Sequence, residues 1–193
     1  HIYNRGTEKR KIFMAQKDYN RFLALIYLCN SSSPVHISVQ GKTLDTLLEI
    51  SRPNSLVDIG AYCLMPNHFH ILIREKIDSG ISLFMQKLTT AYTMYFNKKN
   101  ARSGVLFQGV FKAKHVENDE YLKYLFAYIH LNPIKLIEPN WKENGISDQK
   151  KAKEFLGSYQ YSSYLDFLNN NRKIKKLLNH NNFPGYFEII SDF

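Results

Sequence analysis

The sequence predicts an α+β sandwich in which one antiparallel sheet carries helices mainly on one face. Residues 57–63 and 68–74 alternate their side chains with the period of two that strands show, and a turn containing Met-Pro-Asn separates them. Segments with apolar residues at helical spacing precede and follow this strand pair. The resulting order of strand, helix, strand pair, helix, strand and helix indicates a ferredoxin-like or RRM-like arrangement.

The chain before the strand pair predicts one strand, one helix and a loop. The opening HIYNR is typical of the end of a strand and leads into a basic turn at Gly6. The helix predicted over 15–30 has four apolar residues at the i, i+3, i+4, i+7 spacing, namely Phe22, Leu25, Ile26 and Cys29. Residues 31–55 are interrupted by Ser, Pro and Gly, which indicates a loop or an insertion with a short helix near 43–50.

The chain after the strand pair predicts two further helices and one strand. We expect helices over 80–100 and 118–132, the second beginning near Asn118 and ending near Pro133. Aromatic and β-branched residues between these helices indicate a strand within 104–116.

We expect one main domain with a C-terminal extension. Residues 1–140 would contain the sheet, with 31–55 as an insertion, and 141–193 would pack on this domain or trail from it. The stretch RKIKK at 172–176 is compatible with a nucleic-acid-binding arm and with an amphipathic helix.

Basic residues are in clear excess. Lys and Arg number 26 against 17 Asp and Glu, which gives a formal net charge of +9. Such a charge favours a polyanionic partner, nucleic acid or an anionic membrane surface, although a solubilising excess is the alternative. No apolar stretch approaches the roughly 18 residues of a transmembrane helix, so we expect no membrane span. Cys29 and Cys63 form no CxxC pair and predict free thiols in a reducing cytoplasm.

A pair of histidines stands out in the second strand of the pair. His68 and His70 lie two residues apart, so both imidazoles leave the same face of that strand. At a backbone separation of about 6–7 Å they can converge on one divalent cation. The alternative is that both are ordinary strand residues, and the spacing alone is compatible with either.

The helix over 118–132 places a tyrosine and an asparagine one turn apart. Tyr128 lies at the edge of the apolar stripe, and Asn132 follows four residues later, although Pro133 disfavours helical dihedrals there. A tyrosine in such a position is usually a core residue with its hydroxyl in water. The alternative is a phenolic nucleophile beside a metal-bound phosphate, with Tyr121 and Tyr124 as rivals for that role.

Five segments, in order, resemble one family. MPNHFHILI and YLFAYIHLNPIK are similar to the histidine–hydrophobic–histidine and tyrosine motifs of the HUH single-tyrosine transposases, and in particular of their REP-associated branch. HIYNRG, LFQGVFKAKHV and YQYSSY resemble the flanking motifs of that family. The resemblance extends from residue 1 to about residue 168.

The resemblance implies a mechanism and a site. His68 and His70 match the metal-binding histidines, Asn132 the third ligand and Tyr128 the catalytic tyrosine of the family. It implies that Mg²⁺ or Mn²⁺ assists cleavage and joining of single-stranded DNA at or near hairpins, through a covalent 5′-phosphotyrosine. It also implies a monomer or homodimer in the cytoplasm, associated with the nucleoid and with no membrane.

Basic residues near these motifs are candidates for phosphate contacts, with solvated surface charge as the alternative. They are Arg5, Lys9, Arg10, Lys11, Lys98, Lys99, Arg102, Lys112 and Lys114. Two other functions stay open at this point. The chain could bind DNA hairpins with an idle site, or hydrolyse RNA or another phosphodiester with a metal-activated water.

Overall fold

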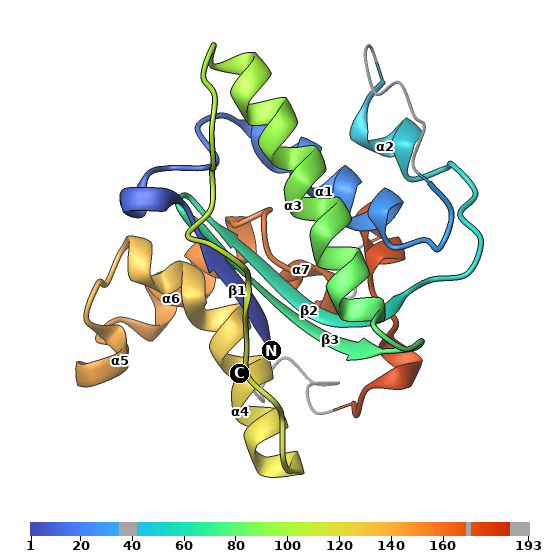
Figure 1. Cartoon of the computed structure of the whole chain (residues 1–193). Helices are drawn as coiled ribbons and strands as arrows, with labels where there is room; N and C mark the ends of the chain where they lie inside the picture. The colour runs from blue at the N-terminus through green and yellow to red at the C-terminus, as the bar shows by residue number, and fades with distance from the viewer. Residues whose placement is uncertain (35–41, 169–170, 186–193) are drawn as a thin grey trace.

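A four-stranded antiparallel sheet forms the centre of the molecule (Figure 1). The computed structural model describes residues 1–34, 42–168 and 171–185, so the middle of the predicted insertion and the end of the extension lie outside the described residues. The strands are β1 (Ile2–Arg5), β2 (Val57–Met65), β3 (His68–Glu75) and β4 (Lys112–Ala113). Their order is β2-β3-β1-β4, which is that of a ferredoxin-like sheet, and the predicted α+β class is confirmed.

Helices connect the strands and continue beyond them. They are α1 (Gln16–Cys29), α2 (Leu44–Leu47), α3 (Gly80–Lys99), α4 (Asp119–Leu131), α5 (Trp141–Asn144), α6 (Gln149–Ser158) and α7 (Tyr164–Phe167). Single 3-10 turns are η1 (Thr7–Lys9), η2 (Asn132–Leu136), η3 (Lys173–Leu177) and η4 (His180–Asn182). The helices predicted over 15–30, 80–100 and 118–132 are confirmed, whereas the one near 43–50 is only a single turn.

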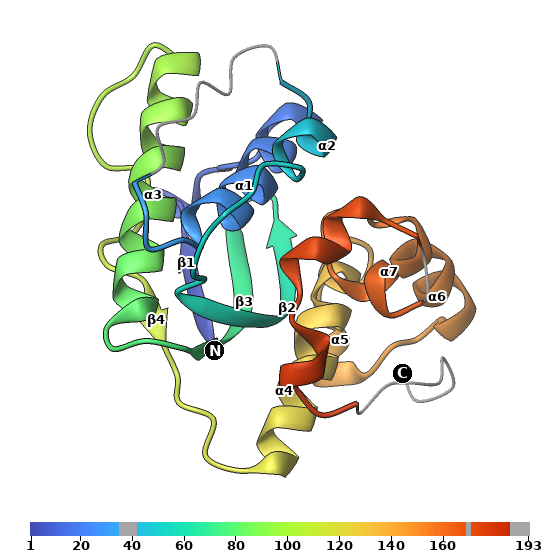
Figure 2. The same cartoon turned by 90° about the vertical axis from the view of Figure 1, so that its right-hand side faces the viewer.

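The helices are divided between the two faces of the sheet (Figure 2). The long helices α1 and α3 share one face, as predicted for most helices, and α4 lies on the other. Alternate side chains of β3 pack on opposite faces of the sheet. Phe69 and Ile71 belong to the core beneath α1 and α3. Leu72 packs on the other face, with Leu125 and Ile129 of α4. The sheet is therefore apolar on both sides, and α4 is fixed beside the face that carries the two histidines.

A β-bulge in β2 changes which side chains face each layer. The sequence pattern predicts that Ile59, Ala61 and Cys63 share one face, but the register shifts between Ile59 and Ala61. Ile59 packs with α1 and α3, whereas Ala61 and Cys63 pack beneath α4. Gly60 lies at the shift, and a Cβ there would come within 2.8 Å of the Phe183 ring. The extra residue thus inverts the alternation of the strand.

The strand predicted within 104–116 is much shorter than expected. Only Lys112–Ala113 pairs with β1, and Phe107 forms an isolated bridge with Gly6. Gly104 and Gly109 have φ of 83° and 65°, a backbone conformation that ends regular strand geometry. The aromatic content of the segment reflects burial of individual side chains rather than a continuous strand.

The C-terminal extension covers the outer edge of β2. Backbone amides of Ser163 and Asn179 donate to Tyr62 O and Ile59 O, each at 2.9 Å. The RKIKK stretch forms the 3-10 turn η3 rather than an amphipathic α-helix, and its Ile174 is buried in the core beside α1. Residues beyond 140 therefore contact the sheet directly. Within the described residues, no helix combines the length and apolarity that a membrane span requires.

Replacing Asn30 with Ala is expected to lower the free energy of unfolding by about 3 kcal/mol. Asn30 is fully buried; its Nδ2 donates to Val57 O at 2.9 Å, and its Oδ1 accepts from the amides of Leu56 and Val57 at 2.8 and 3.0 Å. The substitution would leave these backbone groups buried without partners. Urea unfolding measures the effect, and Ala at the exposed Asn144 is the control. Equal stability of the two variants would contradict this account.

Candidate active site

The two histidines project from one face of β3, as the alternation predicts. His68 pairs with Met65 of β2 and Arg5 of β1, and His70 pairs with Cys63 and Tyr3. Their ring centroids lie 5.1 Å apart, and the ring planes are nearly perpendicular at 89°. Because β3 is hydrogen-bonded to β2 on one side and to β1 on the other, the sheet fixes the relative positions of the two histidines.

Tyr128 of α4 lies directly beside His70. Its ring centroid is 5.4 Å from that of His70, in an edge-to-face arrangement, and the side chain is half-buried. The rotation of α4 is set by its buried face, on which Leu125 and Ile129 pack against the sheet. Among the described residues, the ring contact between this helix and the histidine pair is that of Tyr128 with His70, whereas the rival Tyr124 is 57% exposed.

Asn132 lies one turn beyond Tyr128 and is only 3% exposed. It keeps helical dihedrals, φ −54° and ψ −37°, because the chain passes from α4 directly into η2 and Pro133 occupies its first turn. The amide interacts with the imidazole of His68. Its Oδ1 is buried and has no conventional hydrogen-bond donor among the described residues. An orphaned buried oxygen of this kind suits a bound cation.

Burial keeps both histidines neutral. It lowers the pKa of His68 to about 4, an effect that the Asn132 amide partly opposes and the charges of Lys135 and Arg5 reinforce. Burial likewise lowers the pKa of His70 to about 3, helped by His68 and Lys142. Neutral imidazoles are the form that ligates metals.

The donor set fits a divalent cation. It consists of two imidazoles and one amide oxygen, which suits ions that accept both nitrogen and oxygen ligands. The described part of the chain contains no group of three His, Cys, Asp or Glu side chains placed to hold a metal ion, so a third protein donor beside the two histidines would have to be a residue of another type, such as Asn132.

Hydrogen bonds at the Nδ1 atoms orient the imidazoles. Nδ1 of His68 lies 2.6 Å from Oδ1 of Asn67, whose Nδ2 donates to Lys9 O at 3.2 Å. The second bond fixes which way the amide points, so His68 donates from Nδ1 and its Nε2 carries the lone pair. His70 Nδ1 lies 2.9 Å from Nε2 of His1; only when His70 is the donor does its own Nε2 keep a lone pair.

Three side chains at this site were not predicted from the sequence. His1 and Asn67 orient the histidines, and Nζ of Lys142 lies 4.0 Å from the centroid of the Tyr128 ring. The role of Asn67 could have been predicted, because an asparagine next to a candidate metal ligand can hydrogen-bond that ligand as well as form a turn. His1 and Lys142 lie far from Tyr128 in sequence, and only the fold brings them together.

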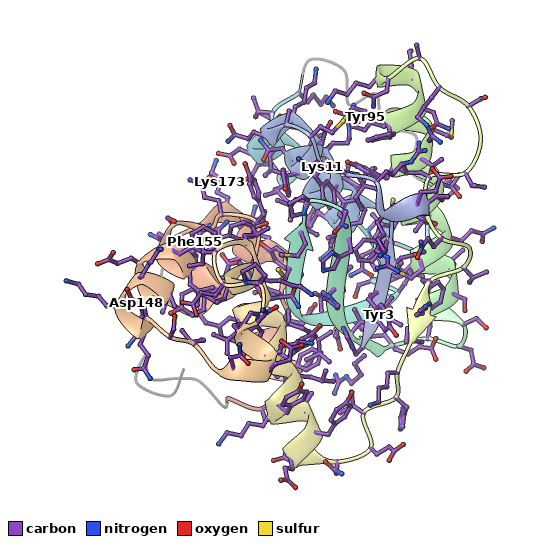
Figure 3. All side chains as sticks on the ribbon, turned by 90° about the vertical axis from the view of Figure 1, so that its left-hand side faces the viewer. Tyr3, Lys11, Tyr95, Asp148, Phe155 and Lys173 are labelled. Carbon is purple, nitrogen blue, oxygen red and sulfur yellow. The ribbon has the colours of Figure 1, made fainter. Side chains whose placement is uncertain are left out.

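A basic pocket of about 620 Å³ opens next to His68. The cations that line it come from separate segments: Arg5, Lys9, Lys11, Lys112 and Lys135. Four of them are predicted phosphate contacts; Lys135 is not. Tyr3 also lines the pocket, and it is labelled with Lys11 in Figure 3. Convergence of five cations on one cavity makes it suitable for a polyanion.

The other predicted cations do not line this pocket. They are Arg10, Lys98, Lys99, Arg102 and Lys114. Lys99 donates to the fully buried carboxylate of Asp18 at 2.5 Å, and Arg102 donates to Val105 O at 3.0 Å, both at the C-terminal end of α3. Nζ of Lys114 lies 4.5 Å from the centroid of the Tyr121 ring. These contacts give Lys99 and Arg102 clear structural roles.

The fold and this site together define the class of the protein. A ferredoxin-like sheet whose histidine pair faces a tyrosine on a packed helix is the arrangement of an HUH-type single-tyrosine domain. A family model described as "Transposase IS200 like" matches residues 11–132, which include His68, His70, Tyr128 and Asn132. The chain belongs to the IS200-like transposase family.

A comparison with solved structures found one that is similar to this chain. It shows a REP-associated tyrosine transposase bound to a REP hairpin, and it is similar to this chain with a TM-score of 0.46 and 11% sequence identity. The similarity covers 86% of this chain and 77% of that chain. No curated protein matches the sequence.

Proposed function

We propose that this chain is a single-stranded DNA endonuclease and strand transferase that acts at or near hairpins through a covalent 5′-phosphotyrosine. The observation that carries the proposal is the placement of the Tyr128 ring 5.4 Å from that of His70, one helical turn before the buried Asn132, in a member of the IS200-like family. A phenol so close to a cation-binding set is suited to attack a phosphate held there.

Tyr128 acts as the nucleophile in this proposal. Its hydroxyl oxygen attacks the scissile phosphorus, the bond from phosphorus to the 3′-oxygen breaks, and the phenol proton is exchanged for one on the departing 3′-hydroxyl. The ammonium of Lys142 lies over the ring and attracts the phosphate towards it. A later 3′-hydroxyl can attack the phosphotyrosine and reseal the strand without ATP, because the linkage retains the energy of the phosphodiester.

His68, His70 and Asn132 would hold Mg²⁺ or Mn²⁺. When bound, such an ion supplies Lewis-acid polarisation of the phosphate and neutralises charge on its oxygens. The Nδ1 bonds to Asn67 and His1 direct the two Nε2 lone pairs away from those partners and towards a ligand. Two nitrogen donors make Mn²⁺ the better-bound of the two ions.

A gel assay tests the proposed chemistry. The protein is incubated with Mn²⁺ and a labelled single-stranded oligonucleotide that contains a hairpin, and the products are separated under denaturing conditions. A protein–DNA adduct that survives denaturation is expected. Cleaved DNA without an adduct would indicate a hydrolase, and binding without cleavage would indicate a DNA-binding protein with an idle site.

DNA binding is expected to weaken roughly 100-fold between 50 and 200 mM salt. The five cations of the basic pocket each offer a phosphate contact, and each contact to a single strand contributes about −0.7 to the slope of log affinity against log salt. Fluorescence anisotropy at several salt concentrations measures this slope, and Lys112→Ala should reduce it by about 0.7. A slope near zero would exclude this pocket as the main binding surface.

A further inference from the structure

Three tyrosines form a row along α4. Tyr121, Tyr124 and Tyr128 follow at intervals of three and four residues, which places them on one side of the helix. Neighbouring ring centroids are 6.1 Å apart at both steps, and the ring planes differ by only 19° and 11°. The row therefore presents nearly parallel aromatic faces that lead from the candidate active site towards the N-terminal end of α4.

Packing does not account for the middle of this row. Tyr121 and Tyr128 are partly buried against the core beneath α4, whereas Tyr124 is 57% exposed. The N-terminal turns of α4 extend beyond the sheet (Figures 1 and 2). A large ring held parallel to its neighbours in solvent offers a flat surface to another aromatic group.

Cations flank both ends of the row. Nζ of Lys114 lies 4.5 Å from the centroid of the Tyr121 ring, and Nζ of Lys142 lies 4.0 Å from that of Tyr128. A row of aromatic faces with an ammonium group at each end matches a single nucleic-acid strand, in which bases can stack while phosphates meet the cations. The charge is thus complementary to an unpaired strand rather than to an apolar partner.

We propose that Tyr121 and Tyr124 form a stacking track for unpaired DNA bases next to the phosphate that Tyr128 attacks. This inference rests on the proposed function, since it needs a DNA strand at Tyr128. The track would hold the strand in line with the nucleophile through base faces, which any sequence can supply. Stacking on an exposed aromatic residue contributes about 1–3 kcal/mol per base, or roughly 5- to 150-fold in affinity.

Binding is measured with Tyr128→Phe as the background, so that no covalent product forms. Fluorescence anisotropy with a short single-stranded oligonucleotide should show at least about fivefold weaker binding after Tyr124→Ala. Tyr124→Phe should bind within about twofold of the background, because the ring is kept. Met94→Ala removes a comparably exposed apolar side chain from α3 and should have no effect.

An oligonucleotide with abasic sites at the unpaired positions separates stacking from charge. It should bind the background protein weakly, and Tyr124→Ala should weaken it no further. If Tyr124→Ala leaves binding of the intact oligonucleotide unchanged, or weakens both oligonucleotides equally, the stacking track is rejected. These results do not depend on the adduct assay: an adduct without a Tyr124 effect rejects the track alone, and a Tyr124 effect without an adduct rejects the proposed chemistry alone.

Discussion

Tyr128→Phe is expected to reduce the yield of the protein–DNA adduct by about 1,000-fold or more, because the substitution removes only the attacking oxygen. The phenyl ring keeps its edge-to-face contact with His70 and its place beneath the Lys142 ammonium. Affinity for the oligonucleotide should therefore change by less than about twofold. Adduct yield on a denaturing gel and affinity by anisotropy give the two numbers separately.

The matched controls are the other tyrosines of the same helix. Tyr121→Phe and Tyr124→Phe remove a hydroxyl from neighbouring rings that lie further from His70 along α4. Both variants should form the adduct at close to the wild-type level. If Tyr128→Phe still forms the adduct at the wild-type level, or if Tyr124→Phe loses it, the nucleophile is a residue other than Tyr128.

The sequence predicts much of the fold because its periodic segments are long. The helices over 80–100 and 118–132 and the strands β2 and β3 are specified by many side chains each, and all four form where the pattern predicts them. The bulge at Gly60 could not be foreseen, since one extra residue inverts the alternation without changing composition. Similarly, two glycines with positive φ break the strand that the aromatic content of 104–116 indicates.

The candidate site, too, could be predicted from the sequence only in part. The period of a strand places His68 and His70 on one face, and the period of a helix places Tyr128 and Asn132 on one side. Each pair can therefore be predicted from the local sequence. The distance between the pairs depends on how α4 packs on the sheet, which local pattern does not contain. His1 enters the site for the same reason, through the pairing of β1 with β3. That the two pairs meet in one site was predicted by the resemblance to the family and not by periodicity.

His70→Ala and His68→Ala are each expected to weaken Mn²⁺ binding by about 100-fold or more, since even partners that only orient a ligand are worth 10–100-fold. Binding of the metal alone, by calorimetry or by the EPR signal of free Mn²⁺, measures the effect without DNA or turnover. The exposed His115 is the control, and His115→Ala should bind the ion as the wild type does. Unchanged affinity in both site variants would remove the histidine pair as the metal site.

Substitutions at Asn67 separate a ligating role of His68 from a merely structural one. Asn67→Ala removes the acceptor at 2.6 Å that holds the proton on His68 Nδ1, so the imidazole can place its proton on Nε2 instead. The Mn²⁺ affinity should then fall about 10- to 100-fold, although no ligand is lost. Asn67→Asp keeps an acceptor at that position and should retain the affinity. If Asn67→Ala and Asn67→Asp bind Mn²⁺ equally well, the hydrogen bond does not set the tautomer, and His68 presents its lone pair for another reason.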